Sequence, residues 1–177
     1  KDYEVAIETA LGGSIQNIVT DNEQTAKRMI SFLKKNRYGR ATFLPLSNIS
    51  GRGGLAQKDV LREPGVVGTA NTLVEADAEY SELVMYLLGR VLVVDNIDHA
   101  IAIGKKYRHS LRMVTIEGES LSPGGSMTGG AFKNNSNLLG RRREIEELER
   151  SVGILKKELE ETQRRSEEHT SELQSQR

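Results

Sequence analysis

An internal duplication is the feature that most constrains the fold of this chain. Residues around the end of one predicted helix recur at a constant offset of 77, and residues around the start of the next predicted helix recur at an offset of 74. The repeated pairs are Tyr3/Tyr80, Leu11/Leu88, Gly12/Gly89, Asp21/Asp95, Asn22/Asn96 and Ala26/Ala100. Because a repeated sequence indicates a repeated structure, we predict two lobes related by a pseudo-two-fold axis.

Hydrophobic periodicity predicts the same order of elements in both halves. The first half is predicted to contain a helix over 3–11, a strand over 15–19, a helix capped by Asp21 or Asn22, and a strand over 41–46. The second half is predicted to contain a helix over 80–88, a strand over 91–94, a helix from Asp95 or Asn96 to Lys106, and a strand over 111–116. This order predicts an α+β fold with mixed sheets flanked by helices.

The repeat also sets the expected domain boundaries. We expect a first lobe over 1–46, a mostly surface connector over 47–64 and a second lobe over 65–140. Residues 65–74 read as an opening strand and turn in the second lobe, and nothing equivalent precedes Lys1. We therefore expect the first lobe to lack its opening strand.

The composition changes after Gly140 to a run rich in Glu, Lys and Arg. Its apolar residues follow the 3-4-3-4 spacing of a coiled-coil seam: Ile145, Leu148, Val152, Leu155 and Leu159. We predict the start of a coiled-coil arm over 141–164, although a single amphipathic helix docked on the domain would show the same pattern. Residues 165–177 resemble the translation of a sequencing adapter, so we leave them out of the functional interpretation.

Composition and charge exclude several classes of function. The 177 residues include no cysteine, which removes disulfides, thiolate nucleophiles and cysteine zinc sites. The scattered His99, His109 and His169 lack the i+4 partner of a helical metal site, so no metal is expected. Since 25 Lys and Arg balance 25 Asp and Glu, any nucleic-acid surface must be a local patch.

No apolar run approaches the roughly 20 residues that span a bilayer, and the first residues are not organised as a signal peptide. We therefore expect a cytoplasmic protein with no membrane partner. No catalytic constellation is present either. Ser122 and Ser126 lack a recognisable His and Asp arrangement, and the acidic run over 75–82 suits a solvated helix start. We expect that the chain is not an enzyme.

Glycines are concentrated between Ser122 and Phe132. The two pairs there are Gly124-Gly125 and Gly129-Gly130. A P-loop would need a lysine after its last glycine, whereas Ala131 follows Gly130. We favour a close backbone-to-backbone interface. The alternatives are a flexible linker, or a small nucleotide-binding enzyme that uses 123–130 as an anion nest.

Basic residues gather at the C-terminal ends of the two repeated helices, over 34–40 and 105–109. Cations at this end complement the helix dipole, which is the simpler interpretation. The functional interpretation is a patch for the phosphate backbone of DNA, without sequence preference, that includes Lys34, Lys35 and Arg37.

Several long segments occur together in one order: YEVAIETALGGSIQNIV, SFLKKNRYGRATFLPL, YLLGRVLVV, RMVTIEGESLSPGGSMTGGAF and LLGRRREIEELE. Over Asp2 to about Gln163 they resemble the hinge domain of prokaryotic structural maintenance of chromosomes (SMC) proteins. The resemblance implies a hinge between two long antiparallel coiled-coil arms of an ATPase. The ATP and Mg²⁺ sites would lie in distant head domains, so no cofactor is expected in this segment.

The resemblance also implies partners and site residues. Hinges of this family form homodimers through paired glycines, which match Gly124, Gly125, Gly129 and Gly130 here. Lysines that contact DNA near the arms correspond to Lys34, Lys35 and Lys133. The implied role is chromosome condensation and segregation at the nucleoid, together with accessory condensin-type subunits. The chain departs from the family pattern in its missing opening strand and incoming arm.

Overall fold

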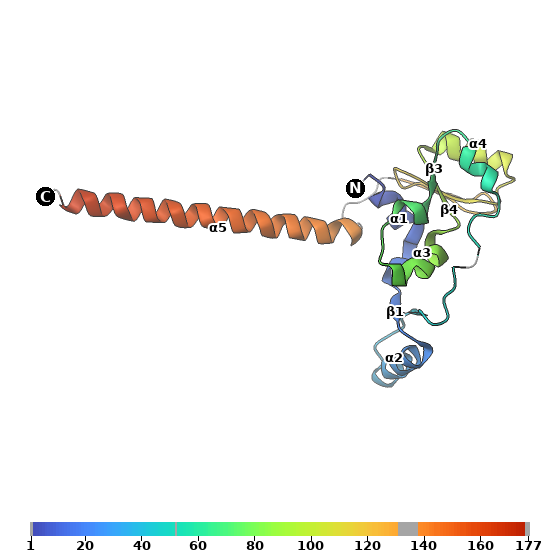
Figure 1. Ribbon diagram of the computed structural model, residues 1–177, viewed down its shortest axis with the longest axis horizontal. Coiled ribbons are helices and arrows are strands. Elements are labelled where there is room, and N and C mark those ends of the chain that lie inside the picture. The colour runs from blue at the N-terminus through green and yellow to red at the C-terminus, as the bar shows by residue number, and fades with distance from the viewer. Residues whose placement is uncertain (1, 52, 131–137, 176–177) are drawn as a thin grey trace. The chain divides into compact units, whose positions relative to one another are not determined.

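The structure is a computed structural model that describes residues 2–51, 53–130 and 138–175. It contains two compact units, Lys1–Ser136 and Asn137–Arg177. The first unit holds two β-sheets with their flanking helices, and the second is a single helix (Figure 1).

The duplicated sequence forms the same strand-helix-strand unit twice. In the first half, β1 (Ile18–Thr20) and β2 (Phe43–Pro45) are parallel and are joined through α2 (Glu23–Asn36). In the second half, β4 (Val91–Val94) and β5 (Arg112–Thr115) are parallel and are joined through α4 (Ile97–Lys106). A helix precedes each unit: α1 (Glu4–Leu11) and α3 (Ser81–Leu88).

The two repeated helices begin with the same capping arrangement. Asn22 has φ −150° and accepts a hydrogen bond from the Thr25 N–H, while Asn96 has φ −151° and accepts one from the His99 N–H. Each amide oxygen satisfies an N–H that the first helical turn leaves open. Of the two candidates predicted at each start, the asparagine is therefore the N-cap.

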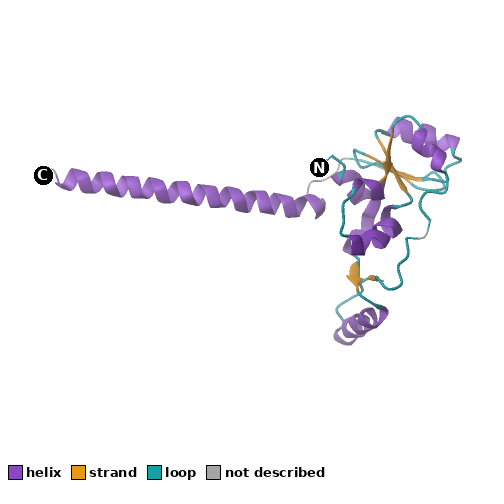
Figure 2. Ribbon diagram, in the orientation of Figure 1, coloured by secondary structure: helices purple, strands orange, loops and turns teal. Residues whose placement is uncertain are grey.

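The second half extends its parallel pair into a five-stranded sheet in the order β3-β4-β5-β6-β7. The added strands are antiparallel to their neighbours: β3 (Val66–Thr69), β6 (Ser120–Leu121) and β7 (Met127–Thr128). Short 3₁₀ helices complete this half and the connector: η2 (Lys58–Arg62), η3 (Ala70–Leu73) and η4 (Ala78–Tyr80). Figure 2 shows the strands of this sheet between helices.

The core lies on both faces of the five-stranded sheet. Val91 and Val93 of β4 point into a cluster with α1 and α3, whereas Leu92 and Val94 point into a second cluster with α4. Successive side chains of a strand alternate between faces, so a sheet covered on both sides requires an unbroken apolar strand such as this one. Helix α1 contributes Ala6, Ile7 and Ala10 to the first cluster.

The first half has a much thinner core. Ile18 and Val19 of β1 are each 41% exposed, whereas all four residues of β4 are buried. In α2, Ala26 is buried, but the apolar side chains of Met29 and Ile30 are exposed. Within the described residues, the outer edges of β1 and β2 have no neighbouring strand like β3 or β6.

The structure departs from the sequence-based expectation in two places. The first strand begins at Ile18 rather than Ile15, because Gly12 has φ +51° and leads into η1, a 3₁₀ helix over Gly12–Gln16. The mostly superficial connector also contributes one core residue, Val60, which is fully buried in the second core cluster. The short strands β6 and β7 were not predicted.

The second unit is the helix α5 (Leu138–Ser175). Its predicted seam residues, Ile145 to Leu159 at heptad spacing, are 49% to 62% exposed. An apolar seam of this kind is the surface that a second helix covers in a coiled coil. Among the described residues, no helix is both long and apolar enough to cross a membrane.

Candidate functional site

The glycine-rich segment forms a hairpin at the end of the five-stranded sheet. Leu121 of β6 pairs with Met127 of β7, and the Ser122 N–H donates to the carbonyl of Ser126 across the turn. One of the two edge strands of this sheet is β7, and Met127 is 52% exposed. The segment therefore presents a short sheet edge with an accessible apolar side chain.

The turn of this hairpin requires glycine for conformational reasons. Gly124 and Gly125 have φ +90° and +92°, a region that residues with a Cβ rarely adopt. The Gly124 N–H donates to the carbonyl of His109 at 2.8 Å, and the Gly125 N–H donates to the carbonyl of Ser122 at 3.0 Å. Both amides are thus committed within the chain, which argues against an anion nest at this segment.

The second glycine pair follows β7. An added Cβ at Gly129 would lie 3.0 Å from Cγ of Glu119, so glycine allows the chain to pass close to that side chain. At Gly130 nothing lies within 4 Å of such an atom. The two pairs therefore lie on either side of the edge strand, one in the turn before it and one just after it.

The basic end of α2 is the second candidate surface. Lys34 and Lys35 lie in its last turn, and Arg37 caps the helix in a left-handed conformation with φ +55°. All three side chains are exposed. Lys34 also lines a shallow groove of about 330 Å³ together with Ile30 and Arg40. Lys133 lies outside the described residues.

The equivalent end of α4 uses its cations differently. Nζ of Lys106 lies 2.6 Å from Oε1 of Glu63, which also accepts a hydrogen bond from the Tyr107 hydroxyl at 3.0 Å. These two donors lower the pKa of Glu63, and the same bond to Glu63 raises the pKa of Lys106. Among the described residues, neither Lys34 nor Lys35 is paired with a carboxylate. The two duplicated helix ends have therefore diverged, and only α2 keeps both lysines available.

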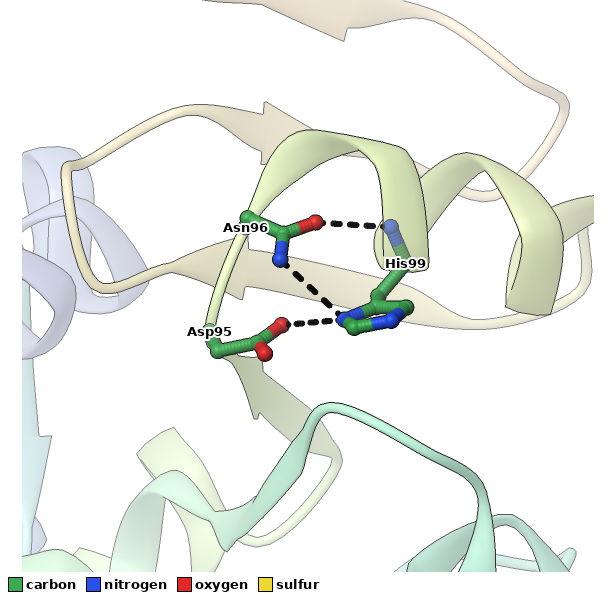
Figure 3. A network of polar contacts seen from close by, with 3 residues as sticks. All are labelled: Asp95, Asn96 and His99. Atoms are coloured by element: carbon green, nitrogen blue, oxygen red, sulfur yellow. Dashed lines mark hydrogen bonds and ion pairs between the residues drawn. The ribbon is translucent and has the colours of Figure 1, made fainter.

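An Asp-His pair stands at the start of α4 (Figure 3). Nδ1 of His99 lies 2.7 Å from Oδ1 of Asp95 and 3.1 Å from Nδ2 of Asn96, the N-cap residue. The carbonyl of Gly65 accepts a hydrogen bond from the Asp95 N–H, which ties the start of β3 to this corner. The arrangement holds a helix start and a strand together. Within the described ranges, no group of three or more His, Asp or Glu side chains could hold a metal ion.

A duplicated strand-helix-strand unit, an accessible sheet edge, and a long helix with an exposed apolar seam are features of an assembly module. The chain belongs to the family of SMC proteins flexible hinge domains, whose family model matches residues 1–104.

Similar proteins agree with this assignment. The chromosome partition protein Smc of Bacillus subtilis is 45% identical over 168 residues, and that of Lactiplantibacillus plantarum is 41% identical over 160 residues. Each match covers 89% of this chain and 14% of the relative, so the chain spans about 14% of the length of these curated proteins.

Solved hinge domains share the fold. An asymmetric dimer of the Geobacillus stearothermophilus SMC hinge domain matches with a TM-score of 0.74 and 44% identity, over 86% of this chain and 62% of that chain. The Pyrococcus furiosus SMC hinge domain matches with a TM-score of 0.60 and 33% identity, over 74% of this chain and 65% of that chain. The predicted family and α+β fold are confirmed. So is the prediction that the chain is not itself an enzyme, because its match is to a hinge domain.

Proposed function

We propose that this chain is a homodimerisation module that uses the hairpin of β6 and β7 as part of its interface. The observation that carries the proposal is the position of β7 at the outer edge of the sheet, with Met127 exposed and a glycine pair on either side. An accessible sheet edge pairs readily with another chain through backbone hydrogen bonds. The Geobacillus relative forms a dimer, which supports the same role here.

Light scattering after size exclusion tests this proposal. The unmodified chain is expected to have the mass of a dimer at micromolar concentration. Gly129→Ala combined with Gly130→Ala, and separately Met127→Glu, are expected to shift the chain toward the monomer. Met127→Glu adds a charge at an exposed position, so it perturbs the interface with little effect on the fold. Gly13→Ala is the matched control, because an added Cβ there meets nothing within 4 Å. A folded, unmodified chain that remains monomeric would overturn the proposal.

We also propose that the basic end of α2 binds the phosphate backbone of DNA without sequence preference. The support is that Lys34, Lys35 and Arg37 are exposed together, and that the two lysines have no carboxylate partner among the described residues. Lys133 belongs to this proposal through the family resemblance. Binding that neutralises phosphates releases counterions, so the affinity should fall steeply as salt rises.

Fluorescence anisotropy with a labelled duplex, measured across a salt series, tests the DNA proposal. Lys34→Glu combined with Lys35→Glu should weaken binding and reduce the slope of log affinity against log salt by roughly 2. Adding Lys133→Glu should reduce this slope further. Lys156→Glu combined with Lys157→Glu, at two exposed positions of α5 away from the seam, is the charge-matched control. Unchanged affinity and slope in the double variant would exclude the patch.

For the whole protein, we propose the role of the relatives named chromosome partition protein Smc. The hinge would join two SMC ATPase subunits whose ATP and Mg²⁺ sites lie in head domains far along the chain. The arm that begins in α5 would connect hinge and head. Association with the nucleoid and with accessory condensin-type subunits belongs to the same proposal.

A further inference from the structure

An open cleft of the first unit lies beside the turn of the glycine-rich hairpin, since Pro123 is among its lining residues. It has a volume of about 950 Å³ and is bounded by the connector at 53–58, the end of α3 and the start of β5. It lies at the starts of the parallel strands β4 and β5, where Val91 and Arg112 line it together with the connector. Volumes of this order are typical of small-molecule sites.

The charged side chains that are described along the cleft are all cationic. Lys58, Arg90 and Arg112 all line it, and no Asp or Glu is among the described residues that do. Like charges concentrated in a concave surface raise the local positive potential and attract anions. The net charge of the whole chain is zero, so this concentration is local.

The walls of the cleft are held in place by polar contacts. Nε of Arg90 donates to the carbonyl of Gly53 at 2.8 Å, which attaches the connector to the end of α3. One Nη of Arg112 donates to the carbonyl of Ala10 at 2.8 Å, which orients that guanidinium. A guanidinium carries five N–H donors, so Arg112 retains donors that match phosphate oxygens.

The cleft also offers an aromatic and aliphatic surface beside the cations. Tyr86 is 56% exposed, and Leu55 and Leu87, which also line the cleft, are half-buried. An exposed aromatic ring close to cations suits a ligand that has both a planar ring and negative charge. We propose that this cleft binds a free nucleotide carrying two or more phosphate groups, with the phosphates at the basic residues and the base against Tyr86.

A tryptophan reporter tests the proposal directly. The chain contains no Trp, so Tyr86→Trp places a single indole in the cleft. ADP should quench its fluorescence in a saturable way, inorganic pyrophosphate should compete, and adenosine without phosphate should bind much more weakly. Calorimetry of ADP with the unmodified chain should give a similar Kd, which guards against an effect of the reporter itself.

Charge variants of the reporter chain complete the test. Lys58→Glu should weaken ADP binding about tenfold at low salt, because it replaces an attraction to phosphate with a repulsion. Lys157→Glu carries the same charge change on α5 and should leave ADP binding unchanged. An absence of saturable ADP binding by both methods would overturn the proposal. An ADP affinity of the Lys58→Glu variant equal to that of the reporter chain would overturn it as well. Binding of a short oligothymidylate without binding of ADP or pyrophosphate would overturn it too, since the phosphates would then come from nucleic acid.

Discussion

Gly65 shows how much one residue can control at the junction of the connector and the second lobe. Its φ is +80°, and an added Cβ would lie 2.2 Å from Nδ1 of His99 and 2.5 Å from Oδ1 of Asp95. Replacement would therefore strain the backbone and displace the Asp-His pair at the start of α4.

We expect Gly65→Ala to lower the free energy of unfolding by about 1–3 kcal/mol. The measurement is urea denaturation followed by circular dichroism. Gly13→Ala, where the new methyl group meets nothing within 4 Å, should change stability by less than about 0.5 kcal/mol. Equal losses in the two variants would contradict the role assigned to Gly65.

The ion pair of Glu63 and Lys106 predicts a specific pH dependence. Because the bonds from Lys106 and Tyr107 lower the folded-state pKa of Glu63 below its ordinary value of 4.5, the pair stabilises the fold above that value. The contribution is lost as the pH falls through the lowered pKa. Glu63→Gln should therefore have a lower urea midpoint than the unmodified chain at pH 7.

At strongly acidic pH the urea midpoints of Glu63→Gln and of the unmodified chain should converge, because protonation of Glu63 removes the same negative charge that the substitution removes. Lys106→Met should show the same behaviour, since the raised pKa of Lys106 keeps it charged throughout this range. The Lys106 side chain is 62% exposed, so the expected difference is small. A gap between the midpoints that does not narrow in acid would show that the carboxylate charge is irrelevant.

At the scale of elements, the connector contributes to the core through η2. Val60 is fully buried against the α4 side of the sheet, whereas the adjacent Leu61 is exposed. Val60→Ala should lower the free energy of unfolding by about 2 kcal/mol, because it leaves a cavity in a packed cluster. Leu61→Ala is the matched control in chemical denaturation and should have little effect. A larger loss at Leu61 would contradict the observed burial.

The duplicated units also differ as elements. In the second lobe, β4 and β5 have antiparallel neighbours on their outer sides, and the four residues of β4 are buried. In the first lobe, the described residues provide β1 and β2 with no such neighbours, and β1 remains partly exposed. A repeated sequence thus specifies the same local unit twice, while the added strands determine how much of each unit is buried.

At the scale of the whole molecule, the two units should differ in local stability. The amides of β4 and β5 lie in a sheet covered on both faces, whereas α5 exposes its apolar seam. A single helix without tertiary packing opens readily. Hydrogen exchange should therefore show strong protection over 91–94 and 112–115, and rapid exchange over 145–159.

A concentration series provides the control for this exchange experiment. If α5 meets a partner helix through its seam, its protection should rise with protein concentration, while that of β4 stays constant. Leu155→Lys should then abolish the rise, because it places a charge on the seam. Strong, concentration-independent protection of α5 would contradict the prediction of rapid exchange over 145–159.

The sequence by itself determined the features that depend on local patterns. The repeat predicted two copies of one unit, the Asp-Asn pairs predicted where both helices begin, and the run from Val91 to Val94 predicted a strand. Capping and hydrophobic periodicity act over a few residues, so they can be recognised before the fold is known. The family resemblance rested on the same kind of local segments.

Only the tertiary structure decided the features that depend on distant residues. The strands β6 and β7 have two residues each, too few for a periodic pattern, and pairing across the sheet defines them. The similar lysines of α2 and α4 were distinguished by Glu63, which lies 43 positions from Lys106. The basic cleft likewise combines Lys58, Arg90 and Arg112 from three separate segments. Long-range packing brings these groups together, and no local pattern in the sequence encodes it.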